Sequence, residues 1–262
     1  AAAVQRYVLR AGGHPDVVLD SSYLDETFYK EASQEQLAWI SPLKNMVFNQ
    51  VDVVINLLAT ENTRSLSGVD PSKNQVRQAA HSELFQKYMQ RAAEGSVRWT
   101  LTQYPCPAYA QEADMSLSEY EDFVYAATFA DQPDPVARWR QISFEQQRLV
   151  DWLKGKEQVI VRGPNADISL SIAGRTFINS YGTHNMPSGE IFTGPVEDSV
   201  NGWIRFTYPA ITHGREVEGV ELEFKEGKIV SARAKKNEEF LISMLDTDPG
   251  ARYLGEFAIG TN

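Results

Sequence analysis

The most constraining feature of this sequence is a change in hydrophobic period near Gly155. Before it, short continuous apolar runs alternate with stretches of helical period, which is the pattern of βαβ units around a mostly parallel sheet. After it, apolar residues alternate in twos between glycine-containing breaks, which is typical of antiparallel hairpins. The sequence therefore predicts an α/β fold with two domains. We expect residues 1–156 to form a parallel α/β domain and residues 157–262 to form a mixed, largely antiparallel β-rich domain.

Three apolar runs of the first region predict strands, over 16–20, 51–59 and 96–105. Because these runs are continuous, we expect strands that are covered on both faces. Helical stretches separate them, and Asp70 with Pro71 has the pattern of a cap and first turn. The predicted helices lie over 1–11, 22–33, 41–50, 70–95 and, in several pieces, 107–155.

Local motifs predict further boundaries. Ser116 and Glu119 have the spacing of a capping box, which indicates a helix start. The letters KEGK at 225–228 predict a hairpin turn between two strands. A last helix is predicted over 237–254, just before Glu256.

Composition and charge exclude several classes of protein. The chain has 262 residues, 42% of them hydrophobic, which suits a folded core. A net charge of -10 argues against nucleic acid as a partner, because phosphate binding depends on Lys and Arg. The single Cys106 excludes an internal disulfide. No run approaches the roughly 20 apolar residues of a membrane span and no signal peptide opens the chain. We therefore expect a cytoplasmic protein without a membrane partner.

Two glutamates are the candidate functional residues. Glu190 follows Gly189 in a segment that Pro187 and Pro195 stiffen, and Glu256 follows Gly255 after the last predicted helix. Two carboxylates without neighbouring histidines suit the acid and nucleophile of a glycosidase. They equally suit part of a hard-cation or dinuclear metal site. Spacing alone leaves both alternatives open, together with two unrelated surface glutamates.

Other reactive residue types show no catalytic pattern. His184 and His213 lie in predicted loops and are interpreted as polar loop residues. Cys106 lies between two prolines without an activating base nearby in the sequence. The chain lacks the Gly-x-Ser-x-Gly nucleophile elbow and the glycine-rich phosphate loops of nucleotide-binding proteins.

Several long segments resemble one known family in the same order along the chain. They include "FINSYGTHNMPSGEIFTGPVEDSVNGWIRFTYPA", "GREVEGVELEF", "KNEEFLISMLDTDPGARYLGEFAIGTN" and, upstream, "PCPAYAQEADMSLSEYEDFVYAA". These segments look like the thermophilic, M29-type metallo-aminopeptidases, the group that contains aminopeptidases T, S and PepS. The likeness extends over essentially the whole chain and is densest from about residue 157 onward.

The resemblance implies a cytoplasmic, usually homodimeric enzyme that removes N-terminal residues from peptides with a free N-terminus, using two divalent metal ions (Zn, Co or Mg). It places the first metal-ligand glutamate of the family on Glu190, and a second ligand, expected to bridge both metals, on Glu256. It assigns no other catalytic residue here, and the remaining ligands of the family follow the point where Asn262 ends the chain.

Both ends of the chain look truncated. It opens inside a helical stretch without a cap and closes on an apolar run. Because two carboxylates are too few donors for two cations, we expect the 262-residue chain alone to bind metal weakly and to be inactive. The alternative is a non-catalytic binding or dimerisation module derived from the same family.

Overall fold

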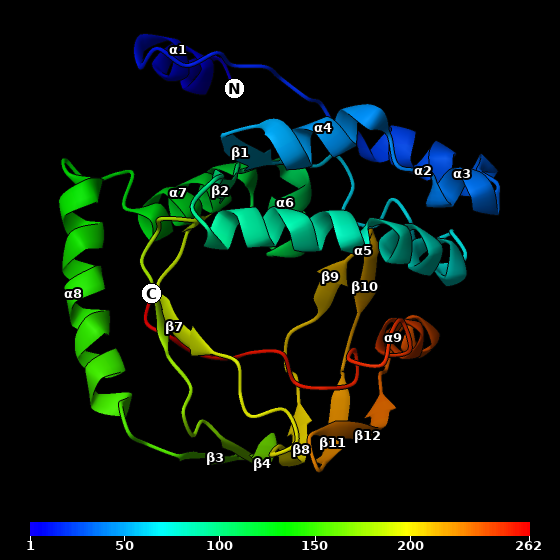
Figure 1. Cartoon of the computed structure of the whole chain (residues 1–262), viewed down its shortest axis with the longest axis vertical. Helices are drawn as coiled ribbons and strands as arrows, with labels where there is room; N and C mark the ends of the chain where they lie inside the picture. Colours follow the sequence, from blue (N-terminus) through cyan, green and yellow to red (C-terminus); the bar gives the residue numbers. More distant parts are fainter.

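A computed structural model describes residues 1–262 and confirms the predicted fold class. Figure 1 shows helices gathered around a small parallel sheet at one end and antiparallel strands at the other, with α8 along one side. The helices are α1 (Ala2–Arg10), α2 (Ser22–Glu31), α3 (Gln34–Ala38), α4 (Pro42–Gln50), α5 (Pro71–Ala93), α6 (Pro107–Glu112), α7 (Leu117–Thr128), α8 (Pro135–Leu153) and α9 (Glu238–Leu245).

The strands form four sheets. The parallel sheet has the order β1-β2-β6, and the antiparallel sheets have the orders β12-β11-β8-β4-β3, β13-β7-β5 and β10-β9. The strands are β1 (Val53–Leu58), β2 (Arg98–Gln103), β3 (Gln158–Gly163), β4 (Ala166–Ser171), β5 (Ile178–Ser180), β6 (Asn185–Met186), β7 (Glu190–Thr193), β8 (Asn201–Arg205), β9 (Ala210–Thr212), β10 (Arg215–Val217), β11 (Glu221–Lys225), β12 (Lys228–Arg233) and β13 (Phe257–Gly260).

Side-chain caps fix the starts of α5 and α7, as the sequence predicts. The Asp70 carboxylate accepts a hydrogen bond from the Ser72 amide at 2.9 Å, so the first turn of α5 has a partner for one of its free N–H groups. Ser116 and Glu119 form the predicted capping box of α7, in which each side chain binds the backbone of the other residue. The predicted turn at KEGK is also confirmed, because β11 and β12 pair there as a hairpin.

Two predictions about the first region are wrong. Residues 16–20 form no strand, and the side chains of Val18 and Leu19 are 72% and 86% exposed. The run is apolar, but no neighbouring strand supplies the hydrogen bonds that a strand needs. The strand β1 is also not covered on both faces, because it is the edge of a sheet of three strands and most of its residues are exposed.

The last predicted helix is shorter than expected. α9 ends at Leu245 and not at 254, and Asp248 accepts a hydrogen bond from the Gly250 amide at 2.7 Å in the turn that follows. Pro249 lies inside that turn, and proline disfavours helical backbone at the residue before it. The chain from 246 onward is therefore free to run across the molecule toward β7, as Figure 1 shows.

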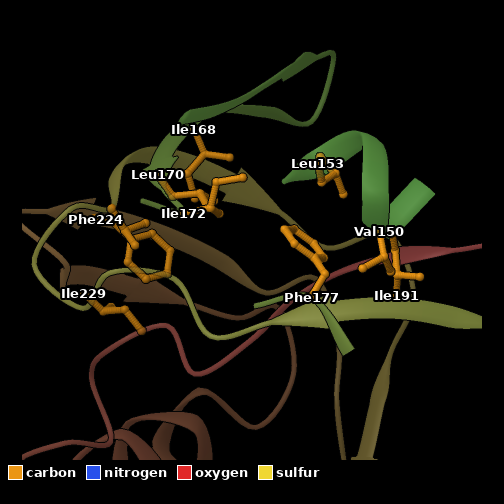
Figure 2. Close-up of a cluster of buried hydrophobic side chains, with 10 residues drawn as sticks. Val150, Leu153, Ile168, Leu170, Ile172, Phe177, Ile191, Phe224 and Ile229 are labelled. Atoms are coloured by element: carbon orange, nitrogen blue, oxygen red, sulfur yellow. The ribbon is translucent and has the colours of Figure 1, made fainter. Parts of the chain in front are cut away.

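The main hydrophobic core lies between the antiparallel sheets and the C-terminal half of α8. Figure 2 shows Val150 and Leu153 of α8 close to Ile191 of β7 and Phe177, with the side chains of β4, β11 and β12 on the other side. Ile191 is fully buried. The ten buried members are Val150, Leu153, Ile168, Leu170, Ile172, Phe177, Ile191, Val200, Phe224 and Ile229.

Much of the chain surface is left uncovered. Its accessible surface is 16748 Å², whereas a compact monomer of this size exposes about 11,500 Å².

No helix combines the length and the apolar character that crossing a bilayer requires.

An ion-pair cluster around Glu216 links the two regions of the chain. Glu216 on β10 accepts hydrogen bonds from Lys236 and from Arg64, whose Nη2 lies 3.1 Å from the carboxylate, and Arg64 also pairs with Glu112 of α6. The Glu216 side chain is only 11% exposed. Hydrogen bonds from Arg64 and Lys236 lower the pKa of Glu216 below its ordinary value of 4.5.

We predict that Glu216→Gln lowers the free energy of unfolding at pH 7 by about 1 kcal/mol, because charge-assisted hydrogen bonds are lost. Since the pKa of Glu216 is lowered in the folded chain, this stabilisation is present above the unfolded-state pKa and is lost as the pH falls through the folded-state pKa. The difference from wild type should therefore shrink in acid, as measured by urea unfolding at several pH values.

Glu221→Gln is the matched control, because Glu221 pairs with Arg205 while both side chains are about half exposed. Exposed pairs contribute little to stability. Equal losses for the two variants would contradict a special role for the Glu216 cluster.

Candidate metal centre

The strand β7 places Glu190. It is the central strand of its sheet, with β5 on one side and β13 on the other. Its side chains alternate, so Ile191 and Thr193 are buried while Glu190 is half-buried on the opposite face. The apolar side of this short strand therefore fixes the direction in which the Glu190 carboxylate points.

The backbone before Glu190 is held by the end of the chain. Gly189 has a φ of 111°, and a Cβ at this position would lie 2.4 Å from the Cβ of Asn262. The Thr261 amide donates to the Gly189 carbonyl at 2.7 Å, and the Asn262 side chain donates to the Ser188 carbonyl at 3.0 Å. Only glycine combines this conformation with such a close approach.

The strand β13 brings Glu256 onto the same face as Glu190. In the antiparallel register Gly260 lies opposite Glu190 and Phe257 lies opposite Thr193. Continuing the register by one residue sets Glu256 opposite Gly194. Gly194 is four residues after Glu190, and side chains an even number of residues apart in a strand point to the same face. Glu256, which directly precedes β13, therefore lies on the same side of the sheet as Glu190, although the two residues are far apart in the sequence.

The two carboxylates influence one another. Glu190 and Glu256 are separated by four register positions, about 13 Å along the strands. Partial burial of the carboxyl, followed by the negative charge of Glu190, raises the pKa of Glu256 above its ordinary value of 4.5. A cation between the two groups would offset this repulsion.

The donor set fits part of a metal site. Carboxylate oxygens are ligands for Mg²⁺, Mn²⁺ and Zn²⁺, so Glu190 and Glu256 can each supply one ligand. No group of three or more His, Cys, Asp or Glu side chains in the chain is arranged to hold a metal ion. The pair therefore fits one side of a cation, and not a full set of ligands for two.

The other reactive residues lie elsewhere. His184 lies against Trp99 in a tilted arrangement with ring centroids 4.6 Å apart, and His213 contacts the hydroxyl of Thr212. Cys106 is buried and its thiol donates to the Thr60 carbonyl at 3.3 Å. None of them joins the carboxylate pair.

One residue of this region was missed by the sequence predictions. Gln146 of α8 is 1% exposed and donates a hydrogen bond to the Glu190 carbonyl at 3.0 Å. The buried stripe of α8 is otherwise apolar, with Trp139, Ile142, Val150 and Leu153. A polar residue at a helical core position was therefore the signal that could have identified it.

Comparison with known proteins identifies the family. The family model described as thermophilic metalloprotease (M29) matches residues 1–262. The chain belongs to the M29 family. The expected resemblance is thus confirmed over the whole sequence.

Relatives within the M29 family are named aminopeptidases. Aminopeptidase 2 of Geobacillus stearothermophilus is 31% identical over 215 residues, which are 76% of this chain and 52% of the relative. Aminopeptidase T of Thermus thermophilus is 30% identical over 213 residues, which are 75% and 52% of the two chains. This chain therefore spans about half the length of the curated relatives that it matches.

A solved structure supports the M29 fold independently. Wild-type AmpT from Thermus thermophilus superposes with a TM-score of 0.77 at 25% identity, covering 98% of this chain and 68% of that chain. Nearly all of the elements of Figure 1 therefore have counterparts in that protein.

We predict that Gly189→Ala lowers the free energy of unfolding by about 2 kcal/mol, because a side chain at positive φ is strained and meets Asn262. Chemical denaturation measures the loss. Gly260→Ala is the matched control in the facing strand, since a Cβ at Gly260 meets nothing within 4 Å. Similar stability of the two variants would show that the chain end does not pack against Gly189.

Proposed function

We propose that the protein is a metal-dependent aminopeptidase, which hydrolyses the N-terminal bond of peptides that have a free N-terminus. The observation that carries this proposal is the match of the whole chain to the M29 family, and the register of β13 against β7, which continues to the same face for Glu190 and Glu256, supports it. The names of the relatives support the choice of reaction. The comparisons give no support to the glycosidase alternative.

We assign the metal-holding role to Glu190 and Glu256. A divalent cation, or a pair of them, supplies a water of lowered pKa and polarises the peptide carbonyl when bound. The chain itself contributes the two carboxylates, and the packing of Gly189 and β7 orients the first of them. Both negative groups also favour the protonated α-amino group of a peptide.

For the 262-residue chain by itself, we expect weak cation binding and no hydrolysis, because its donor set is two carboxylates and no cluster of three ligands is present. The extensive uncovered surface favours a binding or assembly role as the second candidate for this chain alone. The cytoplasmic location, the homodimer and two metal ions in the site stay predictions.

The decisive assay uses the natural polypeptide that contains residues 1–262, treated with EDTA and then supplied with Co²⁺ or Zn²⁺. We predict metal-dependent release of p-nitroaniline from leucyl-p-nitroanilide and none from its N-acetylated form, because the free amine is required. Glu190→Gln and Glu256→Gln should each lower kcat/KM about 100-fold or more, since each removes a ligand charge.

Glu157→Gln serves as the control, because Glu157 is an exposed glutamate before β3. It should leave kcat/KM unchanged. Full activity in either ligand variant, or no hydrolysis with any divalent metal, would refute the proposal.

A further inference from the structure

Gln146 connects α8 to the three strands around Glu190. Its Nε2 donates to the Ser180 carbonyl of β5 at 2.9 Å and to the Glu190 carbonyl of β7 at 3.0 Å. Its Oε1 accepts from the Thr261 hydroxyl, one residue beyond β13, at 2.8 Å. One buried amide thus contacts β5, β7 and the chain that follows β13 at the end where Glu190 lies.

A second amide reinforces the first. The Oδ1 of Asn179 accepts from Gln146 Nε2 at 2.7 Å, and the Nδ2 of Asn179 donates to the Ser143 carbonyl of α8 at 2.8 Å. In both amides, the oxygen and the nitrogen therefore each have a hydrogen-bond partner. A fully satisfied buried network fixes geometry, whereas a partly satisfied one is costly.

Packing alone does not account for a glutamine at this position. Its neighbours on the buried stripe of α8, Ile142 and Val150, are apolar, and an apolar side chain of similar volume would fill the same space. Burying an amide costs free energy unless every hydrogen bond is made. What the amide adds is a defined position for the Glu190 backbone relative to the segment after β13.

We propose that Gln146 is a positioning residue that sets the Glu190 carboxylate for cation binding by fixing the carbonyl of Glu190 and the hydroxyl of Thr261. This inference rests on the proposed function, in which Glu190 holds a divalent cation. Gln146 does not touch the cation. It acts through the backbone of Glu190, as outer partners of metal ligands do in other sites.

The test compares four variants of the natural polypeptide that contains residues 1–262, and one of them is Glu190→Gln. Gln146→Met keeps the volume of the side chain and removes its hydrogen bonds. Gln141→Met makes the same change at an exposed position of the same helix, where the side chain donates a hydrogen bond to Glu145. Val150→Ala destabilises the core one turn away without removing a hydrogen bond to Glu190.

Two readouts separate positioning from stability. Mn²⁺ is titrated into each chain and the free ion is followed by its EPR signal, because Mn²⁺ prefers carboxylate ligands. Hydrogen exchange of the amides of 186–194 reports the order of the strand end without any metal. We expect Gln146→Met to raise the Kd for Mn²⁺ about tenfold and to speed this exchange. Gln141→Met and Val150→Ala should leave the Kd within about twofold of wild type.

The outcomes distinguish this inference from the proposed function. If Glu190→Gln weakens Mn²⁺ binding while Gln146→Met does not, the positioning role is refuted and the metal role of Glu190 stands. If Gln146→Met and Val150→Ala weaken binding equally, Gln146 contributes only stability and the inference fails. If Glu190→Gln leaves Mn²⁺ binding unchanged, the metal role fails, and the exchange of 186–194 alone decides whether Gln146 orders this strand.

Discussion

The pairing of β7 with β13 is the interaction on which the candidate site depends. Without it, Glu190 and Glu256 would lie in unrelated parts of the chain, and the antiparallel register is what gives their side chains one common face. Ile191 of β7 anchors the pairing, because its side chain is fully buried in the main core. At the start of β7, Gly189 and Ser188 accept hydrogen bonds from Thr261 and Asn262, which follow β13.

The same geometry places two negative charges, those of Glu190 and Glu256, on one face of the molecule, where they repel each other. Partial burial and, after it, the negative charge of Glu190 raise the pKa of Glu256. A cation or a proton between the two groups would offset this repulsion. The core beneath β7 and the amide of Gln146 hold the backbone of Glu190 in place.

Local sequence motifs predicted where helices and strands begin better than they predicted which segments pack or pair with one another. The caps at Asp70 and Ser116 and the change of period near Gly155 depend on neighbouring residues, and they were read correctly. The exposed run at 16–20 was misread because a strand depends on its partner as well as on its own residues. Glu190 and Glu256 were singled out by family resemblance, and Gln146 was missed because its contacts join residues far apart in the sequence.

The most direct test of the central claim is the anomalous diffraction of a crystal of this chain soaked with Zn²⁺. If Glu190 and Glu256 hold one cation site, a zinc peak will lie about 2.0–2.2 Å from a carboxylate oxygen of each residue. A zinc peak that contacts neither glutamate, or separate peaks at the two residues, would contradict the account.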